Sequence, residues 1–175
     1  MKQPTILITG GTGFLGSYLL HYLVQKGYRN IRALKRPNSP MDLVQGVVDK
    51  VEWVEGDILD IPRLEDAIKG VQQIYHCAAI VSYDPKDRQK LMEVNVQGTA
   101  NVVNIALDFQ IEKLVHVSSI AALGRSKKTS HLNENAKWEK SKQNSQYAIS
   151  KHLAELEVWR GIAEGLSAAI VNPSI

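Results

Sequence analysis

The chain has 175 residues, 44% of them hydrophobic and 22% charged, which is the composition of a folded domain rather than of a disordered chain. Its net charge of +3 is too small to indicate binding to nucleic acid or to a membrane. Cys77 is the single cysteine, so no internal disulfide is possible, and no apolar run approaches the ~18 residues of a membrane span. The N-terminus carries no targeting pattern, and we therefore expect a cytoplasmic protein.

A glycine-rich stretch near the start of the chain is the first candidate functional site. The apolar run 5–8 predicts a buried strand, and the apolar spacing of 18–24 predicts a helix. Between them lies the sequence Thr9-Gly10-Gly11-Thr12-Gly13-Phe14-Leu15-Gly16. In such a turn one glycine permits the tight bend, another lets the backbone approach a pyrophosphate, and Gly16 lets the helix pack close to the sheet. The alternative, a plain strand-to-helix turn, is disfavoured because both flanking elements are present.

The rest of the chain continues the alternation of strands and helices. Further strands are predicted at 31–34, 51–55, 73–79, 113–118 and 168–171, and helices at 41–48, 64–68, 85–109 and 145–164. This order predicts an α/β fold with a doubly wound parallel sheet, the Rossmann arrangement, as one domain over 1–175. The polar segment 124–144 is expected to be a surface loop near a site.

Two polar residues at strand ends suggest how a dinucleotide is bound. The second strand ends at Arg36, where an acidic residue would hold the ribose 2′-hydroxyl of NAD, so a guanidinium there favours the 2′-phosphate of NADP. The alternative is a solvated basic loop. Asp57 follows the third strand, where its carboxylate either accepts a hydrogen bond from the adenine amino group or caps the next helix.

The fourth predicted strand runs into small residues, Ala78 and Ala79, which let a ligand lie against the backbone. His76 and Cys77 have no metal-ligand spacing, so we expect buried structural roles for them and no metal site. Asn95 lies beside the buried stripe of helix 85–109 and requires a polar partner.

Tyr147 and Lys151 are four residues apart on a predicted helix and so share a face. An ammonium beside a phenol lowers the pKa of the phenol, which would make Tyr147 a general acid or base near neutral pH. Ser119, at the end of the preceding strand, can donate a hydrogen bond to the same substrate oxygen. The alternative is an amphipathic helix with an incidental tyrosine and lysine.

With these motifs the chain resembles the Rossmann portion of an extended short-chain dehydrogenase/reductase, and most closely the dihydroflavonol-reductase-like group. The motifs that carry the resemblance are 9–16, 56–58, 76–79, 95–99, 117–119, Tyr147-x-x-x-Lys151 and 172–174. The resemblance implies that Tyr147 is the acid–base catalyst, that Lys151 also binds the nicotinamide ribose, that Ser119 orients the carbonyl and that Asn95 supports a proton relay. It implies cofactor contacts from Gly10, Thr12, Gly13, Phe14, Leu15, Gly16, Arg36, Asp57, Ile58, Ala78, Ala79, Tyr147, Lys151, Pro173 and Ser174.

The implied reaction is reduction of a small-molecule carbonyl by hydride transfer from NADP, with NAD as the other possible cofactor. Two alternatives stay open: a nucleotide-sugar epimerase or dehydratase with tightly held NAD, and a non-enzymatic dinucleotide sensor of the same fold. Extended members continue into a smaller C-terminal substrate lobe, so we expect this chain to be the N-terminal portion of a longer enzyme. Helix 145–164 offers a surface for a homodimer.

Overall fold

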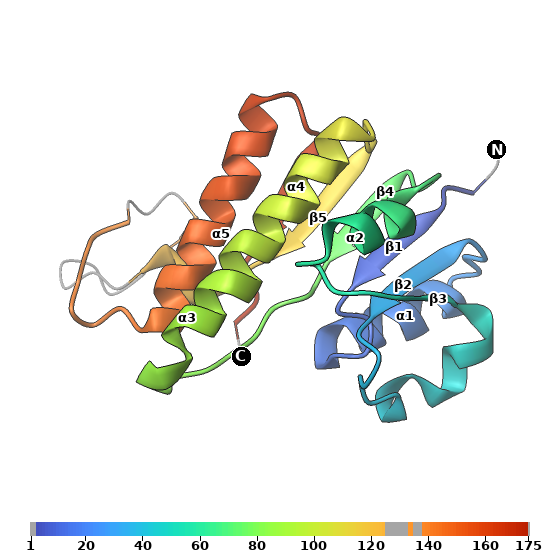
Figure 1. The fold of residues 1–175 in the computed structure, drawn as a ribbon, viewed down its shortest axis with the longest axis horizontal. Helices are drawn as coiled ribbons and strands as arrows, with labels where there is room; N and C mark the ends of the chain where they lie inside the picture. Colours follow the sequence, from blue (N-terminus) through green and yellow to red (C-terminus); the bar gives the residue numbers. More distant parts are fainter. Residues whose placement is uncertain (1–2, 125–132, 135–137, 175) are drawn as a thin grey trace.

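The computed structural model describes residues 3–124, 133–134 and 138–174. Six parallel strands form one sheet in the order β3-β2-β1-β4-β5-β6, which confirms the doubly wound arrangement (Figure 1). The strands are β1 (Ile6–Thr9), β2 (Ile31–Lys35), β3 (Glu52–Glu55), β4 (Gln73–His76), β5 (Lys113–Val117) and β6 (Ala168–Val171). The strand order reverses between β1 and β4, and at such a point the carboxyl ends of the strands leave a crevice for ligands.

Helices cover both faces of the sheet, as expected for parallel strands. The helices are α1 (Phe14–Gln25), α2 (Ile61–Ile68), α3 (Arg88–Leu91), α4 (Gly98–Asp108) and α5 (Gln146–Ala163), with short helical turns η1 (Asp42–Lys50), η2 (Pro85–Asp87), η3 (Met92–Gln97) and η4 (Ile120–Leu123). Helices α2, α4 and α5 pack on one face, while α1 and η1 pack on the other.

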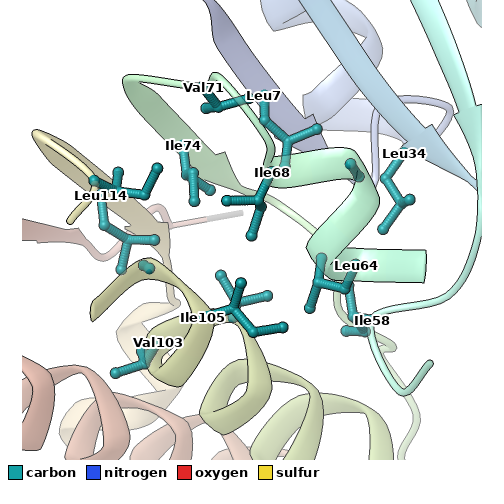
Figure 2. Packing of buried hydrophobic residues seen from close by; sticks show 14 of the residues in the cluster. Leu7, Leu34, Ile58, Leu64, Ile68, Val71, Ile74, Val103, Ile105 and Leu114 are labelled. Atoms are coloured by element: carbon teal, nitrogen blue, oxygen red, sulfur yellow. The ribbon is translucent and has the colours of Figure 1, made fainter. Parts of the chain in front are cut away.

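Two hydrophobic clusters follow from the alternation of side chains along the strands. In β1, Leu7 enters the cluster beneath α2 and α4, whereas Ile6 and Ile8 enter the cluster beneath α1 and η1. Figure 2 shows the first cluster, in which residues from four strands meet side chains of α2 and α4. All three β1 side chains are fully buried, which explains why the strand reads as a continuous apolar run rather than an alternating one.

The predicted long helix 85–109 is instead a series of four segments, η2, α3, η3 and α4. The middle segment, η3, has the wide π-helical turn, which changes the direction in which its side chains point. Gly98 follows it, and a Cβ atom there would collide with the side chain of Ile58. The helix is interrupted where it crosses the end of the sheet, beside the candidate site.

Other boundaries differ from the sequence predictions by a few residues. The predicted strand 73–79 ends at His76, and helix α2 begins at Ile61 because Asp60 caps it, accepting from Arg63 N. Helix α5 begins after Ser145, whose side chain accepts from Ala148 N. Much of the predicted loop 124–144 lies outside the described residues. Among the described residues, no helix is both long and apolar enough to cross a membrane.

Candidate active site and dinucleotide cleft

The glycine stretch forms a tight turn between β1 and α1. Gly10 has a φ of +68°, and Gly13 N donates to Gly10 O at 3.0 Å. A Cβ atom on Gly10 would lie 2.7 Å from the backbone nitrogen of Ala78, and one on Gly16 would collide with Gly10 O. Both positions therefore require glycine, for close approach of β4 and of α1 respectively.

The first turn of α1 has no side-chain cap, in contrast to α2 and α5, which are capped by Asp60 and Ser145. Its free N–H groups and the positive end of its dipole face the cleft side of the glycine turn. This end of the helix suits an anion such as a pyrophosphate, and the residues present fit a dinucleotide.

An open cleft of about 180 Å³ runs along the carboxyl ends of β1, β2 and β4. Eight of the predicted cofactor residues line it: Gly10, Thr12, Gly13, Arg36, Asp57, Ile58, Ala78 and Ala79. Sequence reasoning missed several further lining residues, among them Ser39, Ile80 and Val94. Of these, only Ser39 could have been predicted from the sequence, because it lies three residues after Arg36 in the same turn.

The remaining predicted cofactor residues lie outside this cleft. Phe14 and Leu15 are 86% and 41% exposed at the start of α1. Pro173 is at the end of β6, where its carbonyl accepts from Ile120 N at 3.2 Å and so joins β6 to the segment that follows β5. Ser174 is exposed beside it.

Two basic residues, Lys35 and Arg36, lie at the end of strand β2, and their contacts show which of them is available to a ligand. Lys35 Nζ is paired with Glu55 Oε2 at 3.2 Å across the β2–β3 pair. Arg36 is exposed, its backbone nitrogen donates to Ser39 Oγ at 3.1 Å, and its guanidinium has no ion pair within the described residues. The guanidinium is therefore available to an anionic ligand in the cleft.

Asp57 was predicted either to meet adenine or to cap the next helix. The cap belongs to Asp60, whereas Asp57 Oδ1 accepts from Leu59 N at 3.0 Å and lines the cleft. Asp57 therefore shapes the turn after β3, and its second carboxylate oxygen has no hydrogen bond to the described residues.

Tyr147 and Ser119 meet at the second part of the site. Tyr147, on α5, is 8% exposed. Ser119 follows β5, and its hydroxyl accepts from Ala121 N at 3.2 Å. Burial raises the pKa of Tyr147, and the interaction of the phenol with the Ser119 side chain opposes this rise only in part. The sequence-based expectation of a lowered pKa is therefore wrong for this structure, because desolvation of the phenol outweighs its favourable contacts.

Lys151 is nearly inaccessible, with 2% exposure, and its Nζ donates to Val117 O at 2.9 Å. Burial lowers the pKa of Lys151 to about 8, while Glu155 opposes the decrease. The Lys151 amine is thus held by the last residue of β5, two positions before Ser119.

Asn95 has the polar partners that its place beside a buried stripe requires. Its Oδ1 accepts from Ile80 N at 2.8 Å, and its Nδ2 donates to Ile80 O at 3.0 Å and to Ser150 Oγ at 3.0 Å. Because Ser150 precedes Lys151 on α5, Asn95 ties the segment after β4 to helix α5. Its predicted part in a proton relay stays a prediction.

His76 is fully buried, as the sequence predicts. Its Nδ1 lies 2.7 Å from Thr9 Oγ1 and its Nε2 lies 3.0 Å from Thr99 Oγ1, so it joins β1 to α4. Burial lowers the pKa of His76 to about 3. Cys77 is only partly buried and lines the cleft, and desolvation raises the pKa of its thiol to about 12.

Comparison with known proteins agrees with this geometry. Residues 6–174 match the NAD dependent epimerase/dehydratase family. A candidate dihydroflavonol 4-reductase of Synechocystis sp. is 37% identical over 167 residues, which are 95% of this chain and 48% of the relative. The crystal structure of gox2253 superposes with a TM-score of 0.87 at 36% identity, over 98% of this chain and 52% of that one.

A dTDP-glucose 4,6-dehydratase of Streptomyces venezuelae, DesIV, solved with NAD bound, superposes with a TM-score of 0.82 at 29% identity, over 94% of this chain and 54% of that one. The chain thus spans about half the length of the relatives that it matches. Fold, glycine turn and family match together lead to one conclusion: the chain belongs to the NAD dependent epimerase/dehydratase family, within the short-chain dehydrogenase/reductase superfamily.

Proposed function

We propose that this chain is the dinucleotide-binding portion of an NADP-dependent carbonyl reductase in which Tyr147 is the proton donor. The observation that carries the proposal is the placement of Arg36 on the same cleft as the glycine turn, with no acidic residue at the end of β2. Ser119, which follows strand β5, and Tyr147, on helix α5, form the second part of the site, and Tyr147 is the acid that the reduction needs.

Preference for NADP over NAD follows from charge. A ribose 2′-phosphate is an anion, and a guanidinium binds it with charge-assisted hydrogen bonds. Lys35 is occupied by Glu55, so Arg36 is the basic group of this turn that is left for the ligand. Ser39 lies on the same cleft and offers a hydroxyl to the same phosphate.

The proposed chemistry divides between cofactor and protein. When bound, NADPH supplies the hydride. Tyr147 donates a proton to the carbonyl oxygen, and Ser119 donates a hydrogen bond to that oxygen. Because burial raises the pKa of Tyr147, the phenol stays protonated near neutral pH, and this is the form that a general acid requires. The ammonium of Lys151 lies one helical turn away and stabilises the phenolate that remains.

The test is a fluorescence titration of the purified protein with NADPH and with NADH. We expect NADPH to bind at least about tenfold more tightly, since one charge-assisted pair contributes on the order of 1.5–3 kcal/mol. Arg36→Asp should abolish that preference. Arg29→Asp is the matched control, because Arg29 is equally exposed but precedes β2 at the opposite end of the strand. Equal or tighter binding of NADH by the unaltered protein would contradict the proposal.

A second candidate, a sugar-nucleotide dehydratase or epimerase, is favoured by the likeness to DesIV, whose structure holds NAD. Such an enzyme keeps its cofactor through the reaction. Denaturing the purified protein and identifying any released dinucleotide separates the two: stoichiometric NAD favours the dehydratase or epimerase, whereas its absence together with tight NADPH binding favours the reductase. A non-enzymatic sensor would retain its cellular function in Tyr147→Phe.

A further inference from the structure

Glu155 is a buried carboxylate one helical turn after Lys151 on α5, with 9% of its surface exposed. Its Oε1 accepts a hydrogen bond from Asn172 Nδ2 at 2.6 Å. The same Nδ2 donates to the backbone carbonyl of Ser119 at 3.1 Å. Glu155 therefore connects the catalytic helix, through the residue after β6, to the backbone of the serine that contacts Tyr147. A carboxylate is rarely kept this far from water without a partner for its charge.

The surroundings of Lys151 show which group supplies that charge. The titratable groups around Lys151 come from three parts of the fold: His76 at the end of β4 with Cys77 directly after it, His116 from β5, and Tyr147 and Glu155 from the turns of α5 before and after it. Burial lowers the pKa of His76 to about 3 and that of His116 well below its usual value, and it raises the pKa of Cys77 to about 12. These three side chains are neutral near pH 7, as is the Tyr147 phenol, whose pKa is also raised.

Glu155 thus provides the negative charge in an otherwise neutral, desolvated environment. Its effect on Lys151 is to raise the pKa of the amine, against burial, which lowers it. An attraction of this kind is strong because the intervening medium is protein rather than water.

We propose that Glu155 is a positioning residue for the proposed reductase, which both fixes the Ser119 backbone through Asn172 and keeps Lys151 in its ammonium form. This inference rests on the proposed function for its importance to catalysis. The charge effect itself belongs to the folded protein and does not depend on any substrate.

The decisive variant is Glu155→Gln, because glutamine keeps an oxygen that accepts from Asn172 but removes the negative charge. The Lys151 side chain is titrated by NMR through its ¹³Cε signal, assigned by comparison with Lys151→Arg. We expect the pKa of Lys151 to fall by at least about half a unit in Glu155→Gln. An unchanged titration would overturn the charge role and leave Glu155 as a structural anchor.

Glu157→Gln is the matched control, since it makes the same chemical change two residues later on the same helix. The Glu157 carboxylate bonds Arg160 Nε at 3.0 Å rather than the buried network. It should leave the Lys151 titration unaltered. Should Glu155→Gln fail to fold, Asn172→Ala serves instead: the carboxylate loses the donor that holds it in place one turn from Lys151, and the pKa of Lys151 should fall in the same direction. No change in Asn172→Ala would count against the proposal.

Carbonyl reduction adds a second readout. The alkaline limb of the rate profile in Glu155→Gln should move to lower pH, with kcat reduced and the KM for NADPH little changed. A wild-type protein that reduces no carbonyl would refute the proposed function, yet the NMR titration would still decide the role of Glu155. The two failures are therefore distinguishable.

Discussion

The ring of Tyr83 stands edge-on to the ring of Tyr147, with 6.0 Å between their centroids and 66° between their planes. Tyr147 is almost fully buried, whereas Tyr83 is 74% exposed, so most of one aromatic face is open beside the proposed proton donor. Val81, two residues earlier, is 61% exposed. Tyr83 therefore leaves an open aromatic surface beside the proposed proton donor.

Replacing Tyr83 should therefore alter substrate choice rather than chemistry. An aromatic contact contributes about 0.5–1.5 kcal/mol, so Tyr83→Ala should lower kcat/KM for an aromatic aldehyde such as benzaldehyde by roughly 2- to 10-fold. For a short aliphatic aldehyde such as propanal the value should change less than twofold. Tyr83→Phe, which keeps the ring, should behave like the wild type. Equal losses for both aldehydes would assign Tyr83 to structure instead of to specificity.

Removing only the phenolic oxygen of Tyr147 should separate binding from catalysis. In Tyr147→Phe the ring still packs, but the hydroxyl that interacts with Ser119 and is the proposed proton donor is lost. A positioned general acid contributes about 100- to 10,000-fold, so kcat should fall by at least 100-fold. NADPH affinity should stay within about threefold, measured by fluorescence titration. A loss of NADPH binding of similar size would argue that Tyr147 holds the cofactor and is not mainly the acid.

Lys151 should lower the free energy of unfolding at neutral pH. Its pKa falls from 10.5 in the unfolded chain to about 8 in the folded one, because burial disfavours the ammonium. Between pH 8 and 10.5 the unfolded state binds more protons, so the stability of the wild type rises with pH in this window. From pH 7 to pH 10 the rise attributable to Lys151 is about 2–3 kcal/mol.

Lys151→Met removes this dependence. Urea unfolding measures the free energy of unfolding of both proteins at pH 7 and at pH 10. The difference, variant minus wild type, should be larger at pH 7 than at pH 10 by roughly that amount. Lys90→Met provides the control on exposed helix α3 and should show little pH-dependent difference. The reverse order, with the variant gaining at pH 10, would show that the ammonium is stabilised on folding.

Gly10 and Gly27 share a positive φ, +68° and +85°, but differ in their surroundings. A Cβ atom on Gly27 meets nothing within 4 Å, whereas one on Gly10 would lie 2.7 Å from Ala78 N. Gly27→Ala should thus cost about 1–2 kcal/mol from backbone strain alone. Gly10→Ala should cost more and should also weaken NADPH binding by at least about tenfold, because the methyl group displaces the turn that faces the cleft. Thermal unfolding and the fluorescence titration measure the two effects, and equal behaviour of the two variants would remove Gly10 from the proposed site.

Local patterns in the sequence were sufficient for the architecture. The apolar run before Gly10 and the regular alternation of strands and helices predict elements that the structure contains. The wide turn in η3 could not be anticipated, because apolar residues at positions such as Leu91 and Val102 fit an unbroken helix equally well.

The sequence predicts the site only in part, because its patterns relate residues that are close together along the chain. Tyr147 and Lys151 share a short motif, so the sequence predicts that they lie close together. The sequence does not predict the direction in which the pKa of Tyr147 shifts, because burial of the phenol depends on segments far along the chain. Glu155 and Asn172 are 17 residues apart and meet only through packing of β6 against α5. Glu155 belongs to no motif, and the motif 172–174 does not predict that Asn172 contacts it.

The hydrogen bonds around His76 have a single permitted direction. Thr99 Oγ1 donates its only hydrogen to the carbonyl of Asn95 at 2.6 Å, so it must accept from Nε2 of the neutral imidazole. Nδ1 is then a bare acceptor for the hydroxyl of Thr9, which in turn accepts from Ala78 N at 3.3 Å. The tautomer of His76 is thus set by its neighbours. Since the pKa of His76 is about 3, the imidazole stays neutral and the direction of these hydrogen bonds does not change in the physiological pH range. The link from β1 through His76 to α4, which also holds Ala78 at the edge of the cleft, is consequently insensitive to acidification.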